Sequence, residues 1–334
     1  MDKRKKQVRS FEVAELANIS RSTVSRALSG DPRISQDTRV RVEEAAAKLG
    51  YQPNLIARGL KNQSTDIVGV VVTDLDNPYH AHALQLLIEK LGAKRLAPLV
   101  FVGNTAEGAE NAIARLMSYQ VDAVIALAAP FSEEIVAACR AGKKPLVLMN
   151  RYDGRGDVSF VCGDSDRAGI MVADHLVEQG ATSFAYFAGD DTTSISSERE
   201  SSFTKRLSEK GFELSARAVS RYDHALAMDA APALLSSGAK AIFCANDTLA
   251  FALLDAARMI SPSVRPLIVG YDNSALAARP AYHLTSVDQN LEQMTSATVE
   301  TAHAMMMDPH REVSRIIIEP HLMVRGSTLA NSGN

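Results

Sequence analysis

The sequence predicts an all-α N-terminal head followed by a two-lobed α/β body built from two doubly wound parallel sheets. Three observations lead to this fold class. Short stretches with helical apolar spacing follow one another up to Lys61, strand-like apolar runs alternate with amphipathic stretches from Asp66 onward, and the charge changes sign between the two regions. A small helical domain joined to a larger α/β region accounts for all three.

Length and composition place the chain among globular proteins. Its 334 residues suffice for two or three domains, and 46% hydrophobic and 22% charged residues are ordinary values. No apolar run reaches the ~18–20 residues of a membrane helix, and no signal-peptide core follows the basic N-terminus. The cysteines Cys139, Cys162 and Cys244 lie far apart without metal-ligand spacing. We therefore expect a cytoplasmic protein with no metal and no cofactor.

The charge is divided unevenly along the chain. Up to Lys61 there are 13 Lys and Arg residues against 7 Asp and Glu, a net charge of +6. The remaining 23 basic and 32 acidic residues give −9. A basic head on an acidic body indicates that the head meets a polyanion, although a solvated basic tail is the alternative.

Two short helices with a tight turn between them are expected at the start of the head. The first lies in SFEVAELAN with Ser10 as N-cap, and the second is RSTVSRAL with Ser20 as N-cap. They meet at Ala17–Ser20, where Asn18 tolerates the positive φ of a turn. In a helix-turn-helix of this kind the second helix enters the DNA major groove.

The second helix suits DNA better than a protein core. Its apolar stripe is only Val24, Ala27 and Leu28. Small side chains let a helix approach base edges, and Ser, Thr and Arg donate hydrogen bonds to bases and phosphates. We therefore expect DNA contacts from Ser20, Arg21, Ser22, Thr23, Ser25 and Arg26.

Two further helical stretches complete the head. SQDTRVRVEEAAAKLG predicts a third helix that Ser35 caps and Gly50 ends. YQPNLIARGLKNQS holds a fourth, with Pro53 in its first turn. A helix of about eight residues is marginal in water, so this one should fold only against a partner.

This order of residues resembles the lactose-repressor (LacI/GalR) family of bacterial transcription regulators. The matching stretches of the head are FEVAELANISRSTVSRALSG, RISQDTRVRVEEAAAKLGYQPN and IARGL. The resemblance implies that Arg21 and Ser22 read bases and that Arg26 contacts a base or a phosphate. It also implies that Asn54 to Lys61 form a hinge helix, two copies of which pair in a dimer.

The resemblance assigns a special role to Leu60. In such proteins a leucine at this place wedges into the minor groove at the operator centre and kinks the duplex, which an apolar side chain does by unstacking a base step. Ordinary packing against the body is the alternative. The hinge residues expected at the DNA are Asn54, Ala57, Arg58, Leu60 and Lys61.

The body has the alternation of a doubly wound α/β fold. The strand-like runs are DIVGVVVT, APLVFVG, DAVIALA, PLVLMN, SFAYFAG, KAIFCAN and RPLIVGYD, with stretches such as HALQLLIEKLGA between them. These are too many units for one sheet. A break near Ser159–Asp164 divides them into two lobes.

The resemblance continues through the body in DNPYH, GDSDRAGIMVADHLVEQG, AIFCANDTLAFALLDAAR, VGYDNSALAARPAYHLTSVDQNLEQM and VRGST. It implies a fold similar to periplasmic sugar-binding proteins, in which the chain crosses between the lobes three times. The expected domains are a helix-turn-helix domain over 1–52, a hinge over 53–63, a first lobe over 64–161 and 290–320, and a second lobe over 162–289 and 321–334.

Polar residues that follow the predicted strands are candidates for a binding site, because ligands of open α/β sheets bind at the carboxyl ends of strands. The resemblance adds Arg199, although Ser202 stands where the pattern usually has glycine. Tyr79, His80 and Tyr222 offer ring faces. The expected effector-binding residues are Asn77, Tyr79, His80, Asn150, Arg151, Arg199, Tyr222, Asn246, Asp272 and Gln289, with Asp74 beside them.

Several of these candidates also have a purely structural interpretation. Asn246 and Asp272 suit helix caps, Tyr79 suits the core, and His80 suits a packing or hydrogen-bonding role. Arg199 is the strongest candidate, because a buried arginine needs a partner and an empty cleft offers none.

These observations indicate a sequence-specific transcriptional regulator, most simply a repressor whose operator affinity is switched by a small molecule between the lobes. The mixed donors and acceptors suit a sugar or a sugar derivative, and a corepressor-dependent regulator that binds a purine is the alternative. A sugar-modifying enzyme fused to a DNA-binding head is a further alternative, but the sequence shows no P-loop, no metal spacing among its histidines and no G-x-S-x-G. The head and the missing signal peptide exclude a secreted solute-binding protein.

We expect a homodimer on palindromic operator DNA, because each head reads one half-site. Some family members add a leucine-heptad tail that makes tetramers, whereas this chain stops at Asn334 without one.

Overall fold

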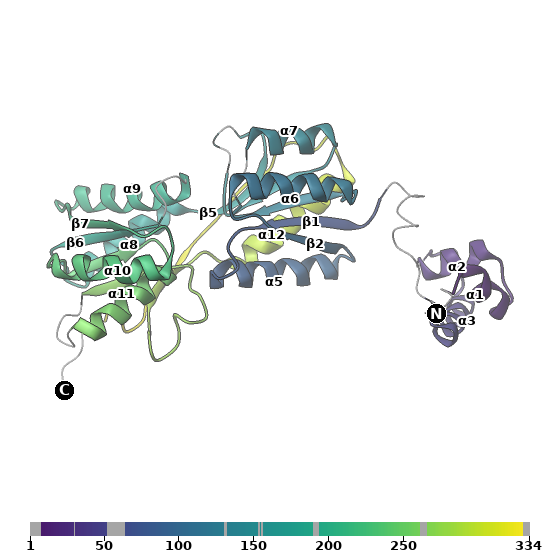
Figure 1. The fold of residues 1–334 in the computed structure, drawn as a ribbon, viewed down its shortest axis with the longest axis horizontal. Coiled ribbons are helices and arrows are strands. Elements are labelled where there is room, and N and C mark those ends of the chain that lie inside the picture. The colour runs from purple at the N-terminus through teal and green to yellow at the C-terminus, as the bar shows by residue number, and fades with distance from the viewer. Residues whose placement is uncertain are drawn as a thin grey trace, which may run out of the picture. The chain divides into compact units, whose positions relative to one another are not determined.

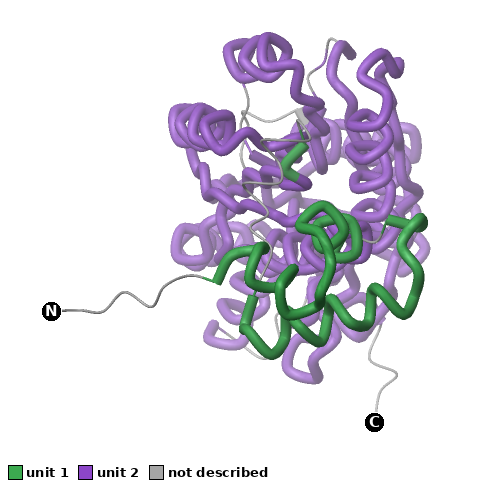
Figure 2. Tube along the Cα trace, turned by 90° about the vertical axis from the view of Figure 1, so that its right-hand side faces the viewer, with its two compact units in different colours: residues 1–65 green, residues 66–334 purple. Residues whose placement is uncertain are grey.

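A computed structural model describes residues 8–29, 31–51, 64–129, 132–152, 154, 156–189, 194–260 and 266–329. The chain divides into two compact units, Met1–Thr65 and Asp66–Asn334 (Figure 2). No helix within these ranges is long and apolar enough to cross a membrane.

The described part of the first unit is a head made of the helices α1 (Ser10–Leu16), α2 (Arg21–Leu28) and α3 (Gln36–Leu49). One fully buried valine from each helix, Val13, Val24 and Val42, meets in its core. The turn between α1 and α2 places Asn18 at φ 52°, as predicted. Ser10 is not the N-cap of α1: Arg9 holds that position, and its backbone N–H donates to the Glu12 carboxylate at 2.9 Å.

The first lobe of the body is a parallel sheet in the order β11-β5-β4-β3-β1-β2. Its strands are β1 (Ile67–Val72), β2 (Ala97–Val102), β3 (Ala123–Leu127), β4 (Leu146–Met149), β5 (Ser159–Gly163) and β11 (Arg315–Ile318). Figure 1 shows α5 (Pro78–Ala93) and α12 (Leu291–Met307) on one face, and α6 (Ala106–Ser118) and α7 (Glu133–Ala141) on the other. Two separate apolar clusters fill the two faces.

The second lobe repeats this plan in the order β12-β10-β9-β8-β6-β7. Its strands are β6 (Phe184–Ala188), β7 (Leu214–Val219), β8 (Ala241–Cys244), β9 (Leu267–Tyr271), β10 (Thr285–Asp288) and β12 (His321–Met323). The helices α8 (Ser165–Glu178) and α9 (Ser194–Glu209) pack together, as do α10 (His224–Ser236) and α11 (Asp247–Ile260) (Figure 1). The predicted fold class is confirmed, with the short β12 as the one antiparallel strand of this sheet.

The chain passes between the two sheets after β5, after β10 and after β11. The boundary expected between 161 and 162 is two residues early, because β5 continues to Gly163 and pairs there with Ile318 of β11. Ladder hydrogen bonds hold these residues in the first sheet, so the second lobe begins with α8. All parallel strands of a lobe point the same way, so their carboxyl ends share one edge of the sheet.

Candidate functional site

Helix α2 presents the polar surface expected of a DNA-reading helix. The Ser20 hydroxyl accepts a hydrogen bond from the backbone N–H of Thr23 at 3.1 Å, and it lies 2.7 Å from the Ser22 hydroxyl. Val24 and Ala27 face the core. The predicted residues Arg21, Ser22, Ser25 and Arg26 are exposed, and Thr23 is half-buried.

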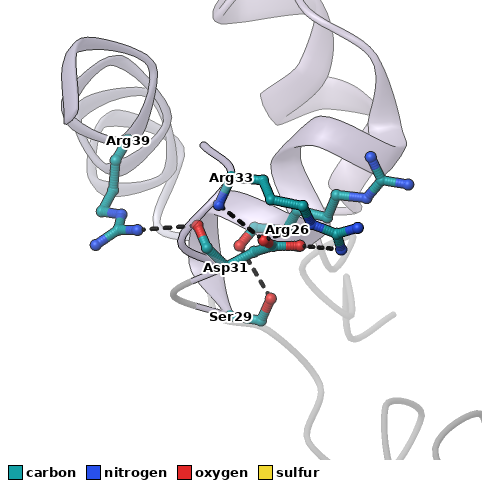
Figure 3. Close-up of polar contacts among 5 residues, drawn as sticks. All are labelled: Arg26, Ser29, Asp31, Arg33 and Arg39. Carbon is teal, nitrogen blue, oxygen red and sulfur yellow. Dashed lines mark hydrogen bonds and ion pairs between the residues drawn. The ribbon is translucent and has the colours of Figure 1, made fainter. Parts of the chain in front are cut away.

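The segment after α2 is held by an arginine–carboxylate fork (Figure 3). Arg33 donates to the Asp31 carboxylate from Nε at 3.0 Å and from Nη2 at 2.7 Å. Hydrogen bonds from Arg33 hold the pKa of Asp31 well below its usual range. The Asp31 carbonyl accepts from Arg39 of α3 at 3.1 Å, and Ser29 donates to the Arg26 carbonyl at 2.9 Å. These bonds tie the end of α2 to α3 and fix how α2 is presented.

The expected hinge contacts Asn54, Ala57, Arg58, Leu60 and Lys61 lie outside the described residues. Their roles stay predictions.

A cavity of about 310 Å³ lies in the body, and both lobes line it. Its wall is made mostly of residues that directly follow strands, as the shared strand edge predicts. The first lobe supplies Thr73, Asp74, Asn77, Tyr79, His80, Asn104, Ala128, Asn150 and Arg151; the second supplies Ile195, Arg199, Arg221, Tyr222, Asn246 and Asp272. Every expected effector-binding residue except Gln289 is among them.

Arg199 is the most unusual residue of this wall. It extends from α9, is only 5% exposed, and its guanidinium carbon lies 3.6 Å from the centre of the Tyr271 ring. Nη1 donates to the Ala245 carbonyl at 3.0 Å, whereas Nε has no hydrogen-bond partner among the described residues. Burial acts to lower the pKa of Arg199, but the surrounding phenol and carboxyl groups raise it overall. The cavity wall therefore carries a buried positive charge with an unused donor.

Asp272 provides the opposite chemistry. Gln289 lies behind it, outside the cavity lining, and its Nε2 donates to Asp272 Oδ1 at 2.7 Å. Burial raises the pKa of Asp272 to about 8, with a smaller contribution from the nearby Asp247. The cap interpretation fits Asn246, which accepts from the backbone N–H of Leu249 at 3.0 Å while it lines the cavity. Asp272 caps no helix.

The aromatic residues differ in how they meet the cavity. Tyr79 is 2% exposed and its hydroxyl donates to the sulfur of Met294 on α12 at 3.5 Å, so it belongs largely to the core. His80 Nδ1 lies 3.0 Å from the Asp74 carbonyl, which can only accept, so Nδ1 carries the proton. Burial lowers the pKa of His80 and favours its neutral form.

Two amides of the first lobe have different roles. Asn77 caps α5 by accepting from the backbone N–H of Tyr79 at 3.0 Å. Asn150 has a left-handed backbone at φ 56°, and its buried Oδ1 has no hydrogen-bond partner within the described part of the chain. Beside it, Arg151 Nη1 donates to the Ala129 carbonyl at 3.2 Å. Asn150 thus offers an acceptor that nothing in the wall uses.

The sequence missed five lining residues: Thr73, Asn104, Ala128, Ile195 and Arg221. All but Ile195 follow a strand closely, so the strand-end rule applies to them as well. No group of three or more His, Cys, Asp or Glu side chains in the described ranges is placed to hold a metal ion.

Two family models match the chain. "Bacterial regulatory proteins, lacI family" matches residues 11–54, and "Periplasmic binding protein-like domain" matches residues 173–328. The HTH-type transcriptional regulator DegA of Bacillus subtilis (strain 168) is 29% identical over 95% of this chain and 97% of its own length. Catabolite control protein A of Staphylococcus xylosus is 27% identical over 95% of this chain and 98% of its own length.

Solved structures of two regulators superpose on nearly the whole length of this chain. A Lac repressor dimer bound to operator and the anti-inducer ONPF superposes with a TM-score of 0.85 at 21% identity, over 97% of this chain and all of that one. A complex of the transcriptional regulator CelR with cellobiose gives 0.72 at 26% identity, over 96% of this chain and all of that one. The head, the two-lobed body and these relatives together show a lacI-family DNA-binding domain joined to a periplasmic-binding-protein-like domain, which is the organisation of a DNA-binding transcriptional regulator.

Proposed function

We propose that this protein is a repressor that binds a palindromic operator as a homodimer, and that a small molecule held between its lobes changes its operator affinity. The observation that carries the proposal is Arg199, a 5% exposed guanidinium with an unused Nε donor at the wall of the cavity. A buried charge is costly unless it is paired, and a bound ligand supplies the missing partner.

The geometry also supports a link between the cavity and the head. Residues 53–63 join the head to β1, whose carboxyl end carries Thr73 and Asp74 of the cavity wall. The remaining wall lies on the second lobe, so a ligand that contacts both lobes changes their relative position. Such a movement alters the spacing of the two hinge segments in a dimer.

A sugar or a sugar derivative is the ligand class that the wall fits best. Asn150, Asn246 and Asp272 supply both donors and acceptors, which suits a molecule rich in hydroxyl groups. The relative CelR, at 26% identity, was solved with cellobiose. A purine would require Tyr79 and Tyr222 as stacking faces, and the burial of Tyr79 in the core counts against it.

The head is the proposed reader of the operator. Exposed Arg21 and Ser22 at the start of α2 read bases, and Arg26 contacts a base or a phosphate. Two heads related by a dimer axis read a palindrome. The protein acts where the chromosome lies, in the cytoplasm, and the proposal requires no chemical reaction.

The test has two stages. Selection of bound sequences from random DNA should yield a palindrome, and sedimentation of the free protein should show a dimer. A thermal-shift screen of sugars, sugar acids, sugar phosphates and nucleobases then identifies ligands, since binding to the native state raises the melting temperature. The proposal fails if compounds that bind in the cavity leave affinity for the selected DNA unchanged.

A further inference from the structure

The charge on the cavity wall is not balanced. Three guanidinium groups line it, on Arg151 from the first lobe and on Arg199 and Arg221 from the second. Among the described residues, two carboxyl groups line it, on Asp74 and Asp272. In the described structure neither Arg199 nor Arg221 forms an ion pair with either of these carboxyl groups. Among the described residues, the guanidinium groups of Arg199 and Arg221 are therefore not neutralised by a carboxyl group of the wall.

Asp272 contributes less negative charge than its type suggests. Burial raises its pKa to about 8, against the smaller opposing effects of the Arg199 charge and of the Gln289 amide, which donates to the same carboxyl group. The raised pKa favours the uncharged form of this carboxyl group. Asp74 lies beside α5 and accepts from the backbone N–H of Asp76 at 3.1 Å. Among the described lining residues, positive charge therefore exceeds negative charge.

Arg221 lies in a turn with an unusual backbone conformation. It follows β7, where Arg221 and Tyr222 both adopt left-handed backbones, at φ 51° and 62°. Two successive residues of this kind are unfavourable without glycine and persist where the surroundings impose them. The Arg221 N–H donates to the Gly189 carbonyl at 2.9 Å, and an added Cβ on Gly189 would lie 2.0 Å from the Tyr222 ring. The missing side chain of Gly189 therefore seats the ring beside Arg221.

The Arg221 side chain is exposed and has no hydrogen-bond or ion-pair partner recorded within the described residues. In an open cleft, water solvates it. The hydroxyl groups of a neutral ligand that displaced this water would accept hydrogen bonds from the guanidinium but would leave its charge unpaired. An anionic oxygen group would replace the water with a charge-assisted bidentate bond.

We propose that the effector bears an acidic group, a carboxylate or a phosphate, whose charge is met by Arg221 together with the other guanidinium groups of the cavity. This inference rests on the proposed function, because it names the chemical class of the ligand of the same cavity. The hydroxyl-rich remainder of the ligand contacts the amides and Asp272. Arg199 and Arg221 then act as specificity determinants for the acid over its neutral parent.

The test compares matched ligands with the full-length protein. The probes are glucose, glucuronate and glucose 6-phosphate, the corresponding galactose and ribose series, and inorganic phosphate, all at constant ionic strength. We expect at least one acid or phosphate to raise the melting temperature while its neutral parent does not. The uronate and phosphate arms separate the two sources of anionic oxygen.

Variants then assign the selectivity to Arg221. Arg221→Gln should weaken binding of the acidic probe by about tenfold or more, the loss expected for a charged hydrogen bond. Arg279→Gln is the matched control, since Arg279 is an exposed arginine of the same lobe outside the cavity lining, and it should bind like the native protein. The proposal is overturned if a neutral sugar binds as tightly as its acid, if Arg221→Gln binds the acid normally, or if no anionic probe stabilises the native protein.

These outcomes are separable from failure of the proposed function. If a neutral sugar binds in the cavity and alters affinity for the selected DNA, the function stands and the acidic class is wrong. If an acid binds through Arg221 but DNA affinity does not change, the ligand class stands and control of operator binding fails.

Discussion

The guanidinium carbon of Arg199, which lines the cavity between the lobes, lies 3.6 Å above the centre of the fully buried Tyr271 ring. The ring packs against the plane of the guanidinium. Nη1 of the guanidinium donates a hydrogen bond to the Ala245 carbonyl at 3.0 Å. Among the residues that the structure describes, none accepts a hydrogen bond from Nε. A side chain held in this way loses little conformational freedom on binding, so its contacts are fully available to the ligand.

Replacement of Arg199 should affect the thermal stability of the protein and its ligand binding in different ways. In Arg199→Met the ligand-free protein should melt at an equal or higher temperature, because an incompletely paired buried charge is removed and the volume is kept. The same variant should lose the thermal shift caused by any cavity ligand. Calorimetry with and without ligand measures both quantities. Arg279→Met, which changes an exposed arginine, should keep the ligand shift; a normal shift in Arg199→Met would remove Arg199 from the site.

Gly189 should be intolerant of even one methyl group. In Gly189→Ala the new Cβ would lie 2.0 Å from Tyr222 Cζ, so the ring must leave its place and its 3.1 Å hydrogen bond to Ser196. We expect a loss of about 1–3 kcal/mol in unfolding free energy and weaker ligand binding.

The matched control for this change is Gly92→Ala near the end of α5, where nothing lies within 4 Å of an added Cβ. It should stabilise the fold by about 0.5–1 kcal/mol, since alanine favours helix more than glycine does. Chemical denaturation compares the two variants. Equal effects would show that the contact with Tyr222 does not exist.

The pH dependence of stability has a predicted sign at Asp272. Burial raises its folded pKa to about 8 from 3.8, so the folded state binds the extra proton. The stabilisation from this group is fully present below pH 3.8 and is lost as the pH rises through about 8. Asp272→Asn should therefore become more stable relative to the native protein between pH 5 and pH 9, as followed by melting temperature.

Asp174 serves as a control with the opposite sign. Burial alone would raise its pKa, but hydrogen bonds from Arg206 and Lys210 lower it overall. Its ion pairs stabilise the fold above the unfolded pKa and are lost on acidification. Asp174→Asn should therefore lose stability relative to the native protein as the pH rises through the unfolded pKa of 3.8, and should keep a constant difference between pH 5 and pH 9. If both variants show the same trend, the assignment for Asp272 is wrong.

Arg21 should determine base preference. It is exposed at the start of α2, and its replacement by alanine should change the sequences recovered by selection from random DNA, at a cost of ~1–3 kcal/mol per contact. Lys48→Ala removes an equal charge from the last turn of α3 and should keep the preferred sequence. Recovery of an unchanged sequence with Arg21→Ala would show that α2 is not the reading helix.

The fold could be predicted where the side chains of an element are themselves apolar along its buried length. Strands such as β3 and β6 are buried along their whole length and stand out as apolar runs. Strand β10 does not, because it contains Thr285 and Ser286, which are fully buried but bonded to Arg325 and Asp247. Those partners lie 39 and 40 residues away in the sequence, so no local pattern reveals them.

The same dependence on long-range contacts explains why some residues of the cavity could not be predicted from the sequence. Strand β7 alternates between half-buried and exposed residues at the edge of its sheet and was not predicted, so the strand-end rule did not reach Arg221. Gln289 was predicted to bind the effector; in the structure its amide donates to Asp272, and it is not among the described residues that line the cavity. Residue type and strand position identify the edge of a sheet, whereas the order of groups along that edge depends on long-range contacts.

The most direct measurement is the affinity of the full-length protein for its selected palindrome, with and without a ligand shown to bind in the cavity. The account predicts a change of about 5–150-fold, which corresponds to a coupling of about 1–3 kcal/mol, and no change in Arg199→Met. A ligand that occupies the cavity and leaves DNA affinity unaltered would contradict the account, as would an Arg199→Met protein that folds and responds normally to the ligand but no longer binds DNA.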